Sequence, residues 1–277
     1  MPKTLIAITG ASSGIGAAFA RRFAPEHDLL LIARRKDKLD ALAEELAKTS
    51  NCRAEVMVAD LGLEADTLAV ADRLASDPQL VLLINNAGFG TKGRFWQTSL
   101  ESQEQMHKLH VMATVRLSHA ALNNLTKRNT GGIINVASVA SFVRSQGSVS
   151  YCATKTWMTA FTEGLYLDLK GAGSKVRVQA LCPGFTYSEF HDTMGAERSA
   201  LAGEAFWHSA EFVVDASITG MRRNKLFVIP GWRYRLLSSL ISKLPTVVRL
   251  RLETAGGRMR ARQILEAQKA SRQLGSE

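Results

Sequence analysis

The sequence has few cysteines and no long apolar run. Its three cysteines, Cys52, Cys152 and Cys182, are too few and too scattered to form a disulfide framework or a metal site. We therefore expect a reducing, cytoplasmic compartment. No apolar stretch approaches the roughly 18 residues of a membrane span, and residues 1–3 lead directly into an apolar strand, so no secretory signal peptide is expected.

Acidic residues are scarce in the last fifth of the chain. Residues 222–277 contain 13 basic and 3 acidic side chains, whereas residues 1–221 contain 22 of each, so the whole net charge of +10 lies in the tail. A neutral body argues against a nucleic-acid-binding protein. The 46% of hydrophobic and 22% of charged residues are typical of a globular protein.

Seven short apolar runs alternate with amphipathic stretches. The runs cover residues 5–9, 29–33, 54–59, 80–84, 132–137, 176–181 and 226–229, and helical spacing of apolar residues recurs over 17–23, 37–48, 65–76, 100–125 and 151–170. Strands that are apolar throughout are buried on both faces, and their alternation with helices makes right-handed crossovers. The sequence therefore predicts an α/β fold, a Rossmann-type doubly wound parallel sheet of seven strands with helices on both faces.

No linker or internal repeat divides the chain, so we expect one domain over residues 1–231 and a basic helical extension over residues 232–277. The extension contains an apolar stripe at helical spacing, formed by Leu236, Leu237, Leu240, Ile241 and Leu244. Pro245 should end that helix and begin the next, and a last polar helix is expected over 258–272. In the body, Thr98 and Glu101 have the spacing of a helix capping box.

The first predicted strand ends in a glycine-rich turn, Thr9-Gly10-Ala11-Ser12-Ser13-Gly14-Ile15-Gly16, which leads into a helix. Glycines let the backbone turn sharply and approach a pyrophosphate, whose charge is held at the N-terminus of the following helix. An ordinary glycine-rich turn is the alternative. The position between the first strand and the first helix favours a dinucleotide site.

The second predicted strand ends at Ala33 and is followed by Arg34 and Arg35. A site for NAD usually has an Asp or Glu here, which hydrogen-bonds the ribose hydroxyls. A carboxylate would repel a 2′-phosphate, whereas a guanidinium can hold it through paired charge-assisted hydrogen bonds. The alternative is two solvated arginines at the start of a helix, but their position favours NADP(H) as the cofactor.

Further short motifs follow in a fixed order. They are Asp60-Leu61, Asn85-Asn86-Ala87-Gly88, Ser138, Tyr151-Cys152-Ala153-Thr154-Lys155 and Pro183-Gly184. Together with the turn at residues 9–16, they make the sequence similar to the short-chain dehydrogenase/reductase family, classical type, over about residues 4–231. The resemblance implies an oxidoreductase that transfers a hydride between NADP(H) and a carbonyl or secondary alcohol. It also implies a homodimer or homotetramer, paired through the helices at 100–125 and 151–170.

In this resemblance three residues carry the chemistry. Tyr151 exchanges a proton with the substrate oxygen, and Ser138 hydrogen-bonds the substrate carbonyl and orients it. A phenol titrates at about pH 10 in water, so Lys155, one helical turn further on, is expected to lower that pKa and to hold the nicotinamide ribose. Without the resemblance, Tyr151 and Lys155 would be an ordinary pair on a helix surface.

The resemblance also assigns the cofactor contacts. They are Gly10, Ser12, Ser13, Gly14, Ile15 and Gly16 of the first turn, Arg34 and Arg35, Asp60 and Leu61 at the adenine, Asn86, Ala87 and Gly88 at its ribose, Tyr151 and Lys155, and Pro183, Gly184, Thr186 and Ser188 at the nicotinamide. Asn86 can instead have a structural role that ties neighbouring strands together. The spacing of the histidines suggests no metal site.

His110 departs from the family pattern. The family usually has an Asn here as a fourth catalytic residue, which helps to hold a water that links the lysine to solvent, and alignment through residues 114–117 places His110 at that position. If the backbone carbonyl holds the water, the side chain can vary. If the side chain is required, the proton relay is altered and His110 itself titrates within it. We favour the first interpretation.

Aromatic residues are concentrated where the family binds its substrate. Phe185, Tyr187, Phe190, Met194, Phe206 and Trp207 belong to a predicted lid, and Phe89, Phe95, Trp96 and Phe142 follow strand ends. They favour a lipophilic ketone or aldehyde as the substrate, unless many of them pack the domain instead. Cys152, next to Tyr151, is expected to be a small packed side chain and not a redox group.

The tail and the function each have alternatives. The tail can cover the substrate pocket, lie on a membrane surface, form an oligomer contact, or present a solvated basic face with its apolar stripe on the body. A non-catalytic NADP(H) sensor or a membrane adaptor on the same fold is the alternative function, and a cofactor-recycling dehydratase or epimerase is a third. The trio Ser138, Tyr151 and Lys155 favours the reductase.

Overall fold

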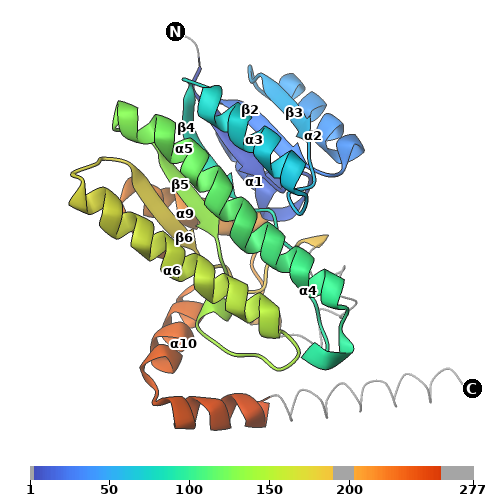
Figure 1. The fold of residues 1–277 in the computed structure, drawn as a ribbon, viewed down its shortest axis with the longest axis vertical. Helices are drawn as coiled ribbons and strands as arrows, with labels where there is room; N and C mark the ends of the chain where they lie inside the picture. Colours follow the sequence, from blue (N-terminus) through green and yellow to red (C-terminus); the bar gives the residue numbers. More distant parts are fainter. Residues whose placement is uncertain (1–2, 190–202, 257–277) are drawn as a thin grey trace, which may run out of the picture.

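A seven-stranded parallel sheet forms the centre of the protein (Figure 1). The computed structural model describes residues 3–189 and 203–256. The strands lie in the order β3-β2-β1-β4-β5-β6-β7, so the chain leaves β1 toward one edge and returns as β4 on its other side, which makes a topological switch point. The strands are β1 (Leu5–Thr9), β2 (Asp28–Ala33), β3 (Ala54–Val58), β4 (Leu80–Asn85), β5 (Gly132–Val136), β6 (Arg177–Leu181) and β7 (Phe227–Val228).

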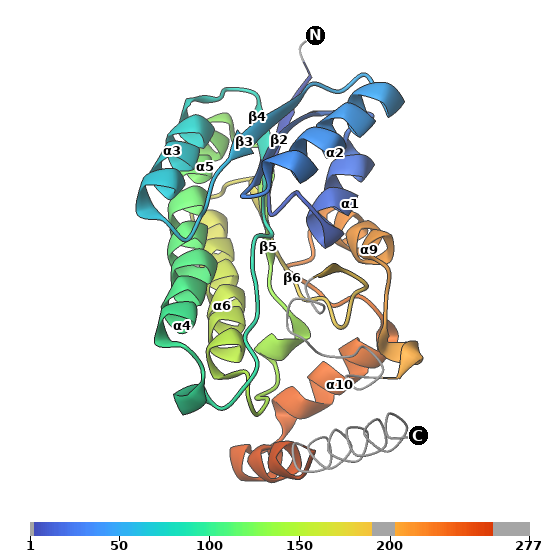
Figure 2. The ribbon, with the colours of Figure 1, turned by 90° about the vertical axis from the view of Figure 1, so that its right-hand side faces the viewer.

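Helices cover both faces of the sheet (Figure 2). One face carries α1 (Gly14–Phe23), α2 (Lys36–Thr49) and α9 (Ala210–Arg222), and the other carries α3 (Glu64–Ser76), α4 (Leu100–His107), α5 (Thr114–Arg128) and α6 (Val149–Gly171). In β1, Ile6 and Ile8 belong to one buried cluster, while Leu5 and Ala7 belong to the other. The two helical layers therefore explain why the strands are apolar throughout.

The predicted fold class is confirmed, and each predicted strand is found with ends that shift by at most about two residues. The long helix expected over 100–125 is α4 and α5 joined by a π-helical segment, η2 (Lys108–Ala113).

The predicted capping box, with its N-cap at Thr98, is wrong by one residue. Ser99 caps α4 by accepting from the Ser102 N–H at 3.2 Å, because the Thr98 hydroxyl donates to the Phe95 carbonyl.

The extension begins with α10 (Trp232–Lys243), which crosses below the carboxyl ends of the strands (Figures 1 and 2). Tyr234 of α10 is 4% exposed and packs on Gly184, where an added Cβ would lie 2.1 Å from the tyrosine ring. Its hydroxyl accepts from the Phe185 N–H at 3.0 Å and donates to the Phe206 carbonyl at 2.7 Å. One side chain thus anchors the extension to the loop after β6.

A second helical stretch, residues 246–256, follows directly after Pro245, as its position predicts. The helix expected over 258–272 lies outside the described residues. The apolar stripe does not pack on the body as a whole, because Leu236 and Leu240 are 54% and 57% exposed. No helix in the described ranges is both long and apolar enough to cross a membrane.

Tyr234→Ala should lower the free energy of unfolding by roughly 3–5 kcal/mol, because a buried aromatic ring and two hydrogen bonds are lost. Trp232→Ala is the matched control, since Trp232 lies on the same helix but is 60% exposed. The control should change the free energy by less than about 0.5 kcal/mol. Urea unfolding followed by circular dichroism measures both, and equal values would refute the anchoring role of Tyr234.

Candidate active site

A large cavity of about 1240 Å³ lies at the carboxyl ends of the central strands. A pocket for one small molecule is typically about 300–1,000 Å³, so this cavity has room for a dinucleotide and a substrate. Ser138, Tyr151 and Lys155 line it, as does every predicted cofactor residue except Gly16. Gly16 and His110 are not part of the lining and lie behind it.

The turn between β1 and α1 leaves no space for side chains at two glycines. A Cβ on Gly16 would lie 2.3 Å from the Gly10 carbonyl oxygen, and Gly10 itself has a φ of +65° and lies against Ala87. The Asn86 side-chain amide donates to the carbonyls of Thr9 and Gly10 at 2.9 and 3.2 Å, so it ties the turn to the end of β4. The N-terminus of α1 opens to the cavity, an arrangement that fits a pyrophosphate.

Two arginines follow β2 at one end of the cavity. The Arg35 guanidinium donates to the Ser12 hydroxyl at 3.0 Å and to the Ser13 hydroxyl at 2.9 Å. Arg34 has a side chain that is 70% exposed and forms a long ion pair of 3.8 Å with Asp60. Two guanidiniums and two hydroxyls thus gather at the place where NAD sites usually have a carboxylate, and this donor set fits a phosphate.

Glu189 lines the cavity and was not anticipated from the sequence. Its carboxylate accepts from Lys38 at 2.9 Å and from Arg35 at 2.7 Å, and these two cations lower its pKa to about 2. Ser188 lies directly against Gly14, where an added Cβ would meet the serine Cβ at 2.9 Å. Residues 184–189 therefore pass over the glycine turn.

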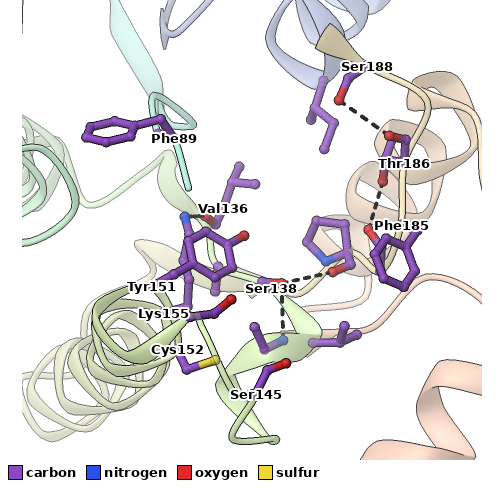
Figure 3. A pocket seen from close by; sticks show the side chains of 18 of the residues that line it. Phe89, Val136, Ser138, Ser145, Tyr151, Cys152, Lys155, Phe185, Thr186 and Ser188 are labelled. Atoms are coloured by element: carbon purple, nitrogen blue, oxygen red, sulfur yellow. Dashed lines mark hydrogen bonds between the residues drawn. The ribbon is translucent and has the colours of Figure 1, made fainter. Parts of the chain in front are cut away.

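Ser138, Tyr151 and Lys155 face one another in the cavity (Figure 3). Ser138 follows β5, while Tyr151 and Lys155 lie one turn apart on α6. The Ser138 hydroxyl hydrogen-bonds Tyr151 and accepts from the Ala140 N–H at 3.1 Å. The Lys155 Nζ donates to the Val136 carbonyl at 2.7 Å and lies 5.9 Å from the centre of the Tyr151 ring.

Burial determines the protonation of this pair. It raises the pKa of Tyr151 to about 12, against a smaller lowering by the hydrogen bond from Ser138, and it lowers the pKa of Lys155 to about 8. The expected lowering of the tyrosine pKa by Lys155 is not found, since burial is the largest effect on the phenol and the Lys155 Nζ donates to the Val136 carbonyl. At neutral pH, Tyr151 is a neutral phenol that can donate a proton, and Lys155 is charged.

His110 is completely buried next to this trio, in the π-helical segment η2. Its Nε2 accepts from the Phe89 N–H at 3.2 Å, so the ring proton is on Nδ1 and is donated to the Thr154 hydroxyl at 2.9 Å. The Thr154 hydroxyl in turn donates to the Tyr151 carbonyl at 3.1 Å. The neutral ring therefore links the loop after β4 to the helix that carries Tyr151.

The pKa of His110 is well below its ordinary value, first because of burial and then because of the charges of Lys155 and His107. Both ring nitrogens are occupied by protein groups. The interpretation in which the side chain titrates within the proton relay is therefore disfavoured, since the ring instead joins the Phe89 N–H to the Thr154 hydroxyl. Sequence reasoning missed its partners because Thr154 resembles any other helix residue.

Only part of the aromatic set reaches the cavity. Phe89 and Phe185 line it, but Phe95, Trp96 and Phe142 do not, which corrects the expectation for these three. Phe95 and Trp96 are 49% and 76% exposed, and Phe142 packs against a buried cluster near Met158. In the rest of the described lid, Trp207 is buried and contacts Phe185 and Tyr187, Tyr187 is 46% exposed, and Phe206 contacts Tyr234. Phe190 and Met194 lie outside the described residues.

Cys152 is a packed side chain, as expected. It is 2% exposed, and burial raises the pKa of its thiol, so it is not an activated nucleophile. Within residues 3–189 and 203–256, no group of three or more His, Cys, Asp or Glu side chains is placed to hold a metal ion.

The extension forms one wall of the cavity, which agrees with one of the alternatives for the tail. Its lining residues are Tyr234, Leu237, Ser238, Ile241, Leu244, Arg249, Leu252, Glu253 and Gly256. Glu253 accepts from the Arg144 N–H at 2.7 Å, while Arg249 Nε and Glu253 Oε2 are buried without a hydrogen-bond partner in the described part of the chain. Neither the pairing of these residues nor their place in the cavity wall was anticipated from the sequence.

Known proteins resemble this chain in sequence and in fold. Residues 4–199 match the family model described as short chain dehydrogenase. The chain is 36% identical over 190 residues to sulfoacetaldehyde reductase 2 of Chromohalobacter salexigens, with 67% of this chain and 74% of that protein covered.

Two solved structures extend the likeness to nearly the whole chain. One is a short-chain dehydrogenase from Sphingobium yanoikuyae in complex with NADPH, with a TM-score of 0.78, 36% identity, and 89% of this chain and 97% of that chain covered. The other is the bulky-bulky ketone specific alcohol dehydrogenase from Comamonas testosteroni, with a TM-score of 0.75, 32% identity, and 89% and 96% covered.

His110→Asn should weaken the loss of stability on acidification. An unfolded histidine has a pKa of about 6.5, and the folded pKa lies well below it, so unfolding takes up a proton below that pH. His110 then removes up to about 1.4 kcal/mol of stability per pH unit as the pH falls below 6.5, and it removes nothing above. Asn takes up no proton, so stability should fall less between pH 6.5 and 5.

Urea unfolding midpoints across that pH range measure the effect. His119→Asn is the control, because His119 lies on α5 and is exposed. This variant should lose stability with falling pH as steeply as the unmodified protein does. If His110→Asn also loses stability as steeply as the unmodified protein between pH 6.5 and 5, the buried, neutral state of His110 is contradicted.

Proposed function

The chain belongs to the short chain dehydrogenase family, and we propose that it is an NADP(H)-dependent oxidoreductase that acts on a carbonyl group or a secondary alcohol. The observation that carries this proposal is the meeting of Ser138, Tyr151 and Lys155 in one cavity with the glycine turn (Figure 3). A carbonyl oxygen beside Tyr151 has both a proton donor and a hydrogen-bond donor within reach.

The nicotinamide, when bound, supplies or accepts the hydride. Tyr151 donates its proton to the substrate oxygen during reduction, since burial keeps the phenol neutral at pH 7. Ser138 hydrogen-bonds the same oxygen and orients the carbonyl. The charged Lys155 stabilises the phenolate that remains, and its Nζ is held in place by the Val136 carbonyl.

We assign the cofactor preference to Arg34 and Arg35. Both line the cavity, and the Arg35 guanidinium is already oriented, since it donates to the Ser12 and Ser13 hydroxyls and to the Glu189 carboxylate. A 2′-phosphate bound here would gain charge-assisted hydrogen bonds that the 2′-hydroxyl of NAD would not. The Sphingobium yanoikuyae relative, which is described in complex with NADPH, supports the same preference.

The substrate half of the cavity favours a lipophilic ketone or aldehyde. Its walls include the apolar side chains of Phe89, Val139, Val143, Phe185 and Ile241. Apolar walls with a few oriented polar groups select for shape and apolar surface in the ligand. The name of the Comamonas testosteroni relative, which is specific for bulky-bulky ketones, supports a large carbonyl compound.

The assembly and the compartment belong to the same proposal. A homodimer or homotetramer would pair through the α4–α5 helix and α6, the two long helices of one face of the sheet. The three cysteines are buried and unpaired, which supports a reducing, cytoplasmic compartment.

NADPH should be oxidised in the presence of apolar ketones or aldehydes, and Tyr151→Phe should reduce turnover by roughly 10²–10⁴-fold because the proton donor is lost. NADPH binding, followed by its fluorescence, should persist in the variant. Tyr166→Phe is the control, since Tyr166 lies on the same helix outside the cavity lining.

NADPH binding without turnover by the unmodified protein would favour a sensor over an oxidoreductase. Substrate conversion without net NADPH consumption would favour a dehydratase or an epimerase. Turnover that survives Tyr151→Phe would remove that residue from the mechanism.

Arg34→Ser and Arg35→Ser should each raise the KM for NADPH by roughly 10–100-fold and leave the KM for NADH almost unchanged, because a hydrogen bond to a charged group contributes about 1.5–3 kcal/mol. Lys36→Ser is the control. Lys36 is the first residue of α2, directly after Arg35, but it pairs with Asp40 and does not line the cavity. Steady-state kinetics with both cofactors measures the ratio. Equal losses for NADPH and NADH would count against a 2′-phosphate site.

A further inference from the structure

The two helices of the extension expose several large apolar side chains. In α10, Tyr234 and Ser238 point into the protein and are buried, whereas Trp232, Leu236 and Leu240 lie on successive turns of the opposite side. These three apolar side chains are 60%, 54% and 57% exposed. A surface helix normally presents polar residues to water, so this face of α10 is unusual.

The helical stretch 246–256 repeats the pattern. Two of its three charged residues, Arg249 and Glu253, line the cavity, while Val247 and Leu250 on the outside are 62% and 49% exposed. We call Trp232, Leu236, Leu240, Val247 and Leu250 the outer face. Both helices lie at the end of the molecule below the carboxyl ends of the strands (Figures 1 and 2).

Positive charge surrounds the outer face. Arg233, Arg235, Lys243 and Arg251 are exposed on the same two helices. Glu253 is the only acidic residue between 232 and 256, and its carboxylate is turned inward to the Arg144 N–H. The described part of the extension thus exposes apolar and basic side chains and no acidic ones.

This charge pattern selects among the partners that can cover an apolar face. A second copy of the chain would bring like charges together, which opposes association through this face. Residues 257–277 add five basic and two acidic side chains, so they increase the positive charge. A surface with apolar depth and negative charge is complementary to both properties, and an anionic lipid bilayer is such a surface.

We propose that the outer face docks the protein on anionic lipid membranes as a peripheral protein. The apolar side chains enter the boundary between headgroups and acyl chains, and the four basic side chains pair with lipid phosphates. Docking does not depend on the catalytic proposal.

Docking has a consequence for the site that does rest on the proposed function. Leu237 and Leu252 line the cavity and are also 45% and 58% exposed, so they form a rim next to the outer face. On a membrane this rim would meet the lipid. A lipophilic substrate would then enter the cavity from the bilayer and not from water.

Cosedimentation of the full-length protein with vesicles tests the docking. The protein should pellet with vesicles of phosphatidylcholine mixed with phosphatidylglycerol, and it should stay in solution with phosphatidylcholine alone. Added salt should release it, because the charge contribution is screened. Leu236→Asp/Leu240→Asp should weaken binding at least about tenfold, since two apolar contacts become repelled carboxylates.

The matched control is Leu63→Asp/Leu68→Asp, which alters two leucines of α3 and its cap that are 58% and 47% exposed far along the chain. It should bind vesicles like the unmodified protein. Neither pair lines the cavity, so the NADPH turnover and the thermal midpoint of both variants report whether they are folded. If neither the unmodified protein nor the two variants oxidise NADPH, while the unmodified protein still binds anionic vesicles, the catalytic proposal is refuted and the docking proposal stands.

Three results would overturn the docking proposal. The first is no pelleting of the unmodified protein with anionic vesicles. The second is equal loss of binding in both double variants. The third is an oligomer in sedimentation velocity that dissociates in Leu236→Asp/Leu240→Asp, without vesicle binding by the unmodified protein, which would assign the outer face to a second copy.

Discussion

The contact between the first turn and the end of β4 is the constraint on which the site depends. Gly10 and Gly16 leave no space for a Cβ, so the Asn86 amide reaches two carbonyls of the turn and holds it against β4. A side chain at either position would push the turn away from the end of β4, and the turn would no longer line the cofactor half of the cavity. Arg35 and Ser188 depend on the same turn, since Arg35 bonds its two serines and Ser188 lies against Gly14.

Local patterns were sufficient for the sheet, its helices and the residues that line most of the cavity. Apolar runs identify buried strands. Positions such as Gly10 and Tyr151 require particular residue types, so the order of the motifs along the chain predicts which residues line the cavity. Contacts between distant residues could not be predicted this way. His110 meets Phe89 and Thr154, which are 21 and 44 residues away. The direction of the Tyr151 pKa depends on burial, which spacing from Lys155 does not reveal, and Trp96 is aromatic but lies at the surface.

The chemistry of the molecule is concentrated at one end. The carboxyl ends of the strands supply the cavity, the loop after β6 crosses it, and the extension closes its side with Arg249 and Glu253 facing inward. Four leucine and isoleucine side chains of the extension also line the cavity, whereas the outer face, formed by Trp232, Leu236, Leu240, Val247 and Leu250, is exposed.

Tyr234 packs its ring on Gly184, so the extension and the loop beside the cofactor share one contact. This has an evolutionary consequence. The extension is not a module that can be exchanged between relatives while the nucleotide half stays unchanged, because a tyrosine on α10 requires a glycine after β6. Substitutions in one segment therefore constrain those in the other. In a chimera that combined an α10 tyrosine with a residue larger than glycine after β6, the two side chains would clash.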